Sequence, residues 1–358
     1  MARTLFTAED CQSIVQVINL TGEPYRVRRE QFFGTASRVE VFELGAQNTK
    51  SGNGLKVNSV RQRTPSEGTE RSGTEHIQCL FDGLPEELSQ EQRERAVEFL
   101  MRNGEVFSKG EFDIGRTHLV EHKIETDGSR PVRQALRRHL IAYLPLIDEY
   151  VQEMQDNGII KPRIGFEWVS NIVLVRKKDG ALRYCIDYSG LNAVTMKANY
   201  LLPRIDACHD SLRGNTYFSS LDMRSGYWQV PVREQDVDKT CFVTRKGIFG
   251  FRVLPFGLYN APSTFQRLVD MALTGLTWEV CLAYLNDLII FSSTFEQHIE
   301  RLQKVFDRLV ATGLKLKPSK CALFQKRVKF LGSIVSDAGI EPDPEKVQAV
   351  AQWPTLTM

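Results

Sequence analysis

Two stretches of the sequence place an aspartate directly after a run of residues typical of a buried strand. The first is SLDMRSGY at residues 220–227, which contains Asp222, and the second is AYLNDLIIF at residues 283–291. In the second stretch, apolar residues on both sides of Asn286 and Asp287 indicate two strands joined by a tight polar turn. Such a hairpin would expose the Asp287 carboxylate at its tip, where it could carry chemistry. The alternative is that both aspartates are ordinary turn residues.

The residues between 169 and 338 predict an α+β domain that would position these two motifs. Short apolar runs there read as strands, and helices are predicted near 261–275 and 296–312. Strands and helices do not alternate strictly, which favours a mixed antiparallel sheet with packed helices over a doubly wound parallel sheet. The predicted strands are NIVLVRKK, ALRYCIDY, TYFSSLDM, TCFVTRKG, GFRVLPF, CLAYL, DLIIFSS and VKFLGSIVS.

Two amphipathic helices are predicted upstream of these strands, within a helical and strand lead-in at 76–157. In the first helix, Ser89 is a suitable N-cap, apolar residues follow at helical spacing, and Gly104 marks the end. The second helix is predicted at 144–157, and one of its faces is formed by Leu144, Ile147, Val151 and Met154.

The first 75 residues differ in character from the rest of the chain. Residues 14–45 alternate apolar and polar positions in VQVIN, YRVRR and VEVFEL, which predicts a small β segment at 1–45. Residues 46–75 are rich in Ser, Gly, Thr and Asn and have almost nothing apolar to bury, which predicts a flexible linker.

The composition is that of an ordinary soluble globular protein. The chain has 358 residues, 42% of them hydrophobic and 25% charged, which is enough for two modest domains. No apolar run suits a signal peptide or a membrane span, so an intracellular location, cytoplasmic or nuclear, is expected. The seven cysteines are odd in number and far apart, which favours reduced thiols. A net charge of +2 neither requires nor excludes a polyanionic partner.

Seven motifs in the right order and spacing make residues 182–332 resemble the polymerase core of Gypsy-type reverse transcriptases. The matching stretches are VLVRKKDGALRYCIDYSGLNAVT, LPRIDACHDSLRGNTYFSSLDMRSGYWQVPV, KTCFVT, LPFGLYNAPSTFQRLVD, YLNDLIIFS, GLKLKPSKC and FLG. A weaker resemblance extends upstream through 158–170. The resemblance as a whole implies the fingers and palm of a right-hand polymerase at 158–336, as found in retrotransposon Pol polyproteins. Template RNA or DNA with a primer, and deoxynucleoside triphosphates, are the implied partners, with no membrane involved.

This family implies DNA synthesis with two divalent cations, Mg²⁺ or Mn²⁺, held by three carboxylates. Such cations activate the primer hydroxyl and stabilise the departing pyrophosphate, and hard Mg²⁺ prefers anionic oxygen ligands. Asp222 and Asp287 match two of the carboxylates, and Asn286 stands at the position of the third. The backbone carbonyl of Met223 is implied as a further metal ligand.

The resemblance also implies roles in binding nucleotide and primer. Basic and bulky side chains would contact the incoming nucleotide: Lys177 and Arg183 its triphosphate, Lys320 its phosphates, and Tyr227 its sugar. Without the resemblance, Lys177 and Arg183 would be solvated charges beside a turn, and Tyr227 a core aromatic residue. Phe256 and Gly257 would approach the nucleotide and template. The hairpin implied to seat the primer terminus is formed by Phe330, Leu331 and Gly332.

The sequence departs from the family pattern in four places. Asn286 supplies no negative charge, which should weaken cation binding and leave polymerase activity near background. Ser189 replaces a usual arginine, which predicts a looser fingers contact. Residues 337–358 begin the connection to a thumb, and neither thumb nor RNase H helices follow, so a truncated polymerase is expected. Residues 1–45 resemble the tail that follows the protease in such polyproteins.

Two further readings stay open beside an impaired polymerase. One is a non-catalytic nucleic-acid-binding or scaffold protein that keeps the fold, a possible pseudoenzyme, and Asn286 favours it. The other is an inert remnant of a genomic element, which no residue type can exclude.

Overall fold

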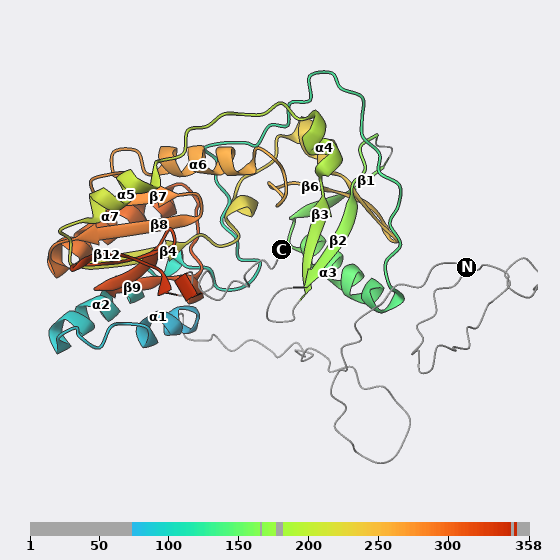
Figure 1. Ribbon diagram of the computed structural model, residues 1–358. Helices are drawn as coiled ribbons and strands as arrows, with labels where there is room; N and C mark the ends of the chain where they lie inside the picture. Colours follow the sequence, from blue (N-terminus) through green and yellow to red (C-terminus); the bar gives the residue numbers. More distant parts are fainter. Residues whose placement is uncertain (1–73, 165–166, 177–181, 345–346, 349–358) are drawn as a thin grey trace, which may run out of the picture. The chain divides into compact units, whose positions relative to one another are not determined.

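The computed structural model describes residues 74–164, 167–176, 182–344 and 347–348 (Figure 1). The chain divides into two units, Met1–Glu67 and Gly68–Met358, and every described residue belongs to the second. The predicted β segment at 1–45 and nearly all of the predicted linker therefore lie outside the described residues.

The described residues form seven α-helices and twelve strands, with short 3-10 turns between them. The helices are α1 (Gln78–Asp82), α2 (Gln90–Arg102), α3 (Leu144–Asp156), α4 (Ser189–Val194), α5 (Ile205–Leu212), α6 (Ala261–Ala272) and α7 (Phe295–Ala311). The strands are β1 (Ile160–Arg163), β2 (Asn171–Arg176), β3 (Leu182–Asp187), β4 (Tyr217–Asp222), β5 (Phe242–Thr244), β6 (Gly247–Phe251), β7 (Cys281–Tyr284), β8 (Asp287–Ser292), β9 (Ala322–Gln325), β10 (Arg327–Phe330), β11 (Ser333–Ser336) and β12 (Gly339–Pro342).

The strands are divided among four antiparallel sheets rather than one mixed sheet. Their orders are β7-β8-β4-β9, β1-β6-β5, β2-β3 and β10-β11-β12. Helices pack on these sheets, so the predicted α+β class is confirmed. We call the four-stranded β7-β8-β4-β9 sheet the palm sheet.

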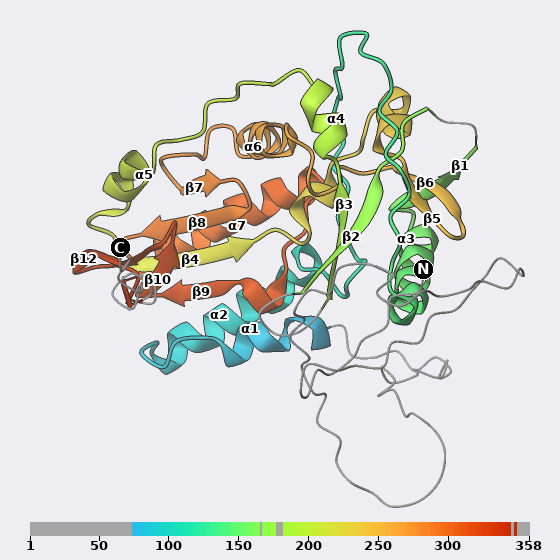
Figure 2. The same cartoon turned by 45° about the vertical axis from the view of Figure 1, so that its right-hand side comes forward.

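The palm sheet is buried on both faces. Side chains alternate along β8, so Leu288 and Ile290 enter one hydrophobic cluster and Ile289 and Phe291 enter another. The first cluster is shared with α2, α6 and α7, and the second with α5 and the β10-β11-β12 sheet. Helix α6 lies beside β7 in both views of the molecule (Figures 1 and 2). Burial on both faces explains why residues 288–291 are continuously apolar instead of alternating.

A buried histidine ties α7 to three strands of the palm sheet. His298 is fully buried, with Nε2 2.7 Å from Ser219 Oγ on β4 and Nδ1 2.9 Å from Ser292 Oγ on β8. Ser292 donates its hydroxyl proton to the Thr294 carbonyl, and Ser219 accepts a backbone N–H from Phe324 on β9. His298 therefore donates from Nδ1 and accepts at Nε2, and every polar atom of this group has a partner.

Two predicted strands differ from the observed ones. The run GFRVLPF was predicted as a strand, but β6 begins earlier and ends at Phe251, because the next residues bond to other segments: Arg252 N–H to the Ile159 carbonyl and Leu254 N–H to the Val230 carbonyl. The run VKFLGSIVS is two strands. Leu331 and Gly332 have φ values of 49° and 82°, which is the backbone of a two-residue hairpin turn.

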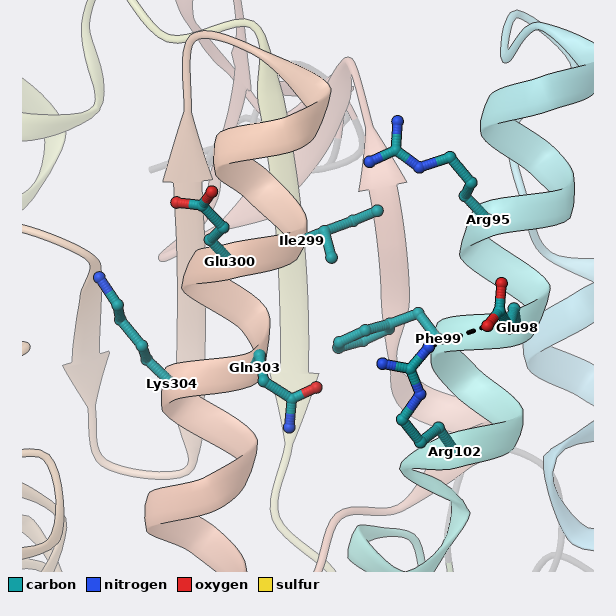
Figure 3. Close-up of a pocket in the computed structure, with 8 residues that line it drawn as sticks. All are labelled: Arg95, Glu98, Phe99, Arg102, Ile299, Glu300, Gln303 and Lys304. Atoms are coloured by element: carbon teal, nitrogen blue, oxygen red, sulfur yellow. Dashed lines mark hydrogen bonds and ion pairs between the residues drawn. The ribbon is translucent and has the colours of Figure 1, made fainter.

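Both predicted upstream helices are present. Ser89 caps α2 in a capping box, since Gln92 N–H donates to its hydroxyl and its own N–H donates to Gln92 Oε1. Helix α2 lies beside α7, with Phe99 and Ile299 pointing into a groove of about 530 Å³ between them (Figure 3). None of the predicted site residues lines this groove. No described helix is long and apolar enough to cross a membrane.

Candidate active site

The two predicted aspartates lie opposite each other in the palm sheet. Asp222 ends β4, Asp287 begins β8, and they are direct partners in the antiparallel ladder. Cross-strand partners project from the same face with Cβ atoms about 5 Å apart, so both carboxylates share one face at one end of the sheet. Lys320 reaches the same place, with its Nζ 3.2 Å from Asp222 Oδ2.

The shared location makes ionisation of Asp287 unfavourable. Partial burial and the neighbouring Asp222 carboxylate raise the pKa of Asp287, and the Lys320 ammonium opposes them by lowering it. Two neighbouring carboxylates attract a cation, and the Lys320 ammonium lies beside them.

The turn between β7 and β8 is held in an unusual conformation. Leu285 has a φ of 53°, in the left-handed region, which costs a leucine roughly 1 kcal/mol. Its N–H donates to Oε1 of the fully buried Gln266 at 2.7 Å, and Gln266 Nε2 donates to the Ala283 carbonyl at 3.2 Å. Gln266 thus bonds to both sides of the turn. Nothing local in the sequence links this helix residue to a turn 19 positions later, so its contacts with the turn could not be predicted.

Asn286 turns its side-chain oxygen away from solvent. Its Oδ1 is buried and accepts no hydrogen bond. A Cβ placed on Gly226 would lie only 2.3 Å from this atom and 2.8 Å from Phe265 Cζ, so Asn286 Oδ1 packs against the Gly226 Cα. Only a glycine at 226 leaves room for it.

The described residues do not fit a site for two cations. No group of three or more His, Cys, Asp or Glu side chains is close enough to hold a metal ion within the described part of the chain. Two carboxylates are present where the resemblance implies three. The third position carries a neutral amide whose oxygen is already packed against Gly226.

The backbone beside Asp222 keeps the Met223 carbonyl out of strand pairing. Met223 forms an isolated antiparallel bridge with Leu316, in which Lys317 N–H donates to the Asp222 carbonyl and Arg224 N–H donates to the Lys315 carbonyl. The bridge therefore uses the groups on either side of Met223 and leaves its own carbonyl outside the pairing.

Three residues predicted to contact nucleotide meet in a line of neighbouring side chains. The Arg183 guanidinium on β3 lies 5.8 Å from the centre of the Phe256 ring, and that ring lies 5.3 Å from the ring of Tyr227. Tyr227 is half-buried and also contacts Phe265 at 5.5 Å. The line joins the β2-β3 ribbon to the segment that follows Asp222.

Gly257 allows the loop before α6 to lie close to α4. It has a φ of 98°, and its carbonyl accepts a hydrogen bond from Asn192 Nδ2 at 2.8 Å. Asn192 Oδ1 also accepts the Tyr259 N–H at 2.8 Å, which fastens this loop to α4.

Of the remaining predicted residues, some are placed elsewhere and one is not described. Lys177 lies outside the described residues. Phe330 ends β10 and is buried beside Phe218. Phe218 lies on β4 four residues before Asp222, which is about 13 Å along the strand. Leu331 and Gly332 form the β10-β11 turn.

Ser189, where the family usually has arginine, bonds to its neighbour instead. Its hydroxyl and N–H donate to Asp187 Oδ1 at 2.6 and 3.1 Å, and Arg137 Nη2 lies 3.2 Å from Asp187 Oδ2. The hydrogen bonds from Ser189 and the Arg137 charge keep the pKa of Asp187 below its usual range. A guanidinium therefore does lie beside Asp187, but it belongs to Arg137 and not to residue 189.

The described residues thus combine an antiparallel sheet, which presents paired aspartates at one end, with a line of basic and aromatic side chains. Residues 175–335 match the family model described as "Reverse transcriptase (RNA-dependent DNA polymerase)". The chain thus carries a reverse transcriptase domain of the retrotransposon Pol type. Reverse transcriptases generally use divalent metal ions.

Curated relatives from Drosophila melanogaster include two transposon proteins. The chain is 34% identical over 245 residues to the Retrovirus-related Pol polyprotein from transposon 297, which covers 67% of the chain and 23% of that relative. It is 31% identical over 260 residues to the Pol polyprotein from transposon gypsy, which covers 71% of the chain and 25% of that relative. The chain therefore spans about a quarter of the length of these relatives.

Solved structures with the same fold include the foamy viral protease-reverse transcriptase. Its complex with an RNA/DNA hybrid matches with a TM-score of 0.71 at 19% identity, covering 82% of this chain and 39% of that one. Its complex with dsDNA matches with a TM-score of 0.72 at 20% identity, covering 82% and 60%.

Proposed function

We propose that this chain contains the fingers and palm of a Gypsy-type reverse transcriptase that binds primer–template and deoxynucleoside triphosphate but transfers nucleotides at a rate near background. The observation that carries the proposal is Asn286, whose amide oxygen is buried against Gly226 beside only two carboxylates. The 31% identity to the gypsy Pol polyprotein supports the Gypsy subtype.

The expected loss of activity follows from charge. Three carboxylates neutralise most of the charge of two divalent cations, whereas Asp222 and Asp287 supply two negative charges and Lys320 offsets one of them. Loss of a residue that merely orients a ligand costs about 10 to 100-fold in affinity or activity, and loss of a ligand itself should cost at least that much.

The expected binding of nucleotide and template rests on groups that Asn286 does not affect. Arg183 and Lys177 would contact phosphate oxygens, Tyr227 with Phe256 would contact the sugar, and Lys320 would lie beside the phosphates. Primer–template as partner is supported by the matched foamy viral structures, which hold an RNA/DNA hybrid and dsDNA. Binding of this kind falls steeply with salt, because it displaces counterions from the phosphates.

A non-catalytic nucleic-acid-binding protein is the second candidate, and the same observation favours it. A polymerase fold without its third carboxylate keeps the surfaces that bind nucleic acid while losing the chemistry. The two candidates differ in one respect. An aspartate at position 286 should restore catalysis to an impaired polymerase whose remaining site is intact, but not to a non-catalytic nucleic-acid-binding protein.

Primer extension on an RNA template tests the proposal. The parent chain and Asn286→Asp are compared in Mg²⁺ and in Mn²⁺, with binding of the same primer–template measured at low and high salt. Gln155→Glu, at an exposed position of α3, is the control for an added negative charge. We expect Asn286→Asp to extend at least 10-fold faster than the parent, with equal binding.

The remaining outcomes are also decisive. Equal extension by the parent and Asn286→Asp would show that the amide is not the defect. Binding without extension by either protein would support the non-catalytic candidate, and absence of binding at low salt would contradict both.

A further inference from the structure

The segment that connects α4 to α5, residues 195–204, runs along α6 (Figures 1 and 2). Asn260 fastens its first part, accepting the Ala198 N–H at 3.0 Å and donating from Nδ2 to the Met196 carbonyl at 2.7 Å. Further on, the hydroxyl of Tyr200 donates to Asp270 Oδ2 at 2.6 Å. This connecting segment is thus bonded to both ends of α6.

Asp270 passes the contact on to the turn at 284–287. Its other oxygen, Oδ1, accepts a hydrogen bond from Gln266 Nε2 at 2.9 Å. The same Gln266 amide bonds to the Ala283 carbonyl and to the Leu285 N–H, as described above. Three successive side chains therefore join the connecting segment to the backbone on either side of Tyr284.

The carboxylate of Asp270 is one of three partners that fix which way the Gln266 amide faces. An amide has two N–H donors on one side and a carbonyl acceptor on the other. With the observed orientation, both donors meet acceptors, on Asp270 and Ala283, and the carbonyl meets the Leu285 N–H. The reverse orientation would face oxygen with oxygen at Asp270 and Ala283, and N–H with N–H at Leu285. All three contacts would be lost inside a fully buried position.

The Tyr200 hydroxyl holds Asp270 in the rotamer that meets Gln266. Burial and the hydrogen bond to Asp270 raise the pKa of Tyr200 to about 12, so the hydroxyl remains a donor at ordinary pH. Removing that donor frees the Asp270 carboxylate to rotate toward solvent.

We propose that Tyr200 and Asp270 are positioning residues for the 284–287 turn. Acting through Gln266, they hold Leu285 in its left-handed conformation and so fix where Asp287 stands opposite Asp222. Because Asp287 ends this turn and begins β8, a change in the turn would move one carboxylate of the pair relative to the other. The catalytic part of the inference rests on the proposed function, whereas the positioning of the turn does not.

A similar pair elsewhere on the surface provides a matched control. On α7, Gln303 Nε2 donates to Asp307 Oδ1 at 2.7 Å with the same four-residue spacing, but this pair does not contact the turn. Tyr217, at the opposite end of β4 from Asp222, is the control for loss of a tyrosine hydroxyl.

The experiment measures hydrogen exchange at the Leu285 amide together with steady-state primer extension. Tyr200→Phe, Asp270→Asn, Tyr217→Phe and Asp307→Asn are each made in the full chain carrying Asn286→Asp. We expect Asp270→Asn to lower protection of the Leu285 amide about 10-fold and Tyr200→Phe about 3-fold, with both controls unchanged. We expect kcat to fall in the same order while KM for nucleotide stays within about twofold, because the change affects the turn rather than nucleotide binding.

Unchanged protection in both test variants would overturn the proposal, as would a fall in kcat no larger than that of the controls. If the Asn286→Asp chain fails to extend primers at all, the proposed function fails. The positioning role is then judged by the exchange of the Leu285 amide alone.

Discussion

The two ends of strand β4 hold polar groups of opposite character. At the end near Tyr217, His298 bonds to Ser219 and Ser292, and each of these polar atoms has a partner. At the other end, Asp222 faces Asp287 and the nearby Asn286 oxygen has no hydrogen-bond partner. The first end joins a helix to three strands and stabilises the sheet. At the second end the two carboxylates repel each other and the Asn286 oxygen is unpaired. Both features cost stability, and such costs are typical of ligand-binding sites.

Replacing His298 tests whether its end of the strand dominates stability. His298→Ala removes the hydrogen bonds to Ser219 and Ser292, which each keep one other partner, and opens a cavity. We expect the free energy of unfolding in urea to fall by about 3 kcal/mol. His118→Ala, at an exposed position, is the control. A loss below about 1 kcal/mol for His298→Ala would mean that the network is not stabilising.

Acid should weaken the histidine end and relieve the carboxylate end. Burial lowers the pKa of His298 to about 3 and that of His122, a buried histidine that lies outside this end of β4, to about 4. At acid pH the unfolded chain therefore binds protons that the folded chain does not bind. Stability is therefore full above about pH 6.5 and falls below it, by about 2 kcal/mol at pH 5 for each histidine. The raised pKa of Asp287 has the opposite sign, since it favours the folded chain at low pH. Urea unfolding at pH 7.5 and 5, for the parent and His298→Gln, measures the first effect, which should be smaller in His298→Gln.

Filling the space beside Asn286 should disturb the carboxylate end selectively. A methyl group at Gly226 would lie 2.3 Å from Asn286 Oδ1 and 2.8 Å from Phe265 Cζ. We expect Gly226→Ala to lower the free energy of unfolding by about 2 kcal/mol, because the turn or the ring must move. Gly110→Ala is the control, since nothing lies within 4 Å of its added methyl. Equal free energies of unfolding for Gly226→Ala and Gly110→Ala would show that the turn can move aside without loss of stability.

Neutralising one carboxylate should have the smallest effect and the opposite sign. Asp287→Asn removes the repulsion from Asp222, and in EDTA we expect it to stabilise the chain by less than about 1 kcal/mol, because the partly buried Asp287 side chain still reaches solvent, which screens its charge. Thermal unfolding beside Asp307→Asn checks this expectation. Destabilisation by Asp287→Asn would indicate that the carboxylate is bonded rather than repelled.

The strands that carry the aspartates could be predicted from the sequence because their signals are local. The apolar runs around 217–222 and 287–292 and the polar pair at 286–287 indicate strands and a turn without knowledge of their partners. Strand β9 was not predicted. Its residues Ala322–Gln325 are short, and they become a strand by pairing with β4, about a hundred positions earlier.

The meeting of Asp222, Asp287 and Lys320 followed from the family resemblance, while the surroundings of Asn286 did not. The sequence predicted its missing charge, but its packing against Gly226 depends on the backbone of another segment. The contacts of Gln266 and Asp270 were not predicted for the same reason, because they depend on a turn that is distant in the sequence and adjacent to α6 only in the fold.

We propose that position 286 in the 284–287 turn lacks a carboxylate that is needed to bind two cations. Titration with Mn²⁺, followed by electron paramagnetic resonance in the presence of primer–template, tests it most directly on the parent and Asn286→Asp. We expect Asn286→Asp to bind Mn²⁺ at least 10-fold more tightly than the parent. Equal affinity and equal numbers of bound ions in the two proteins would contradict the account.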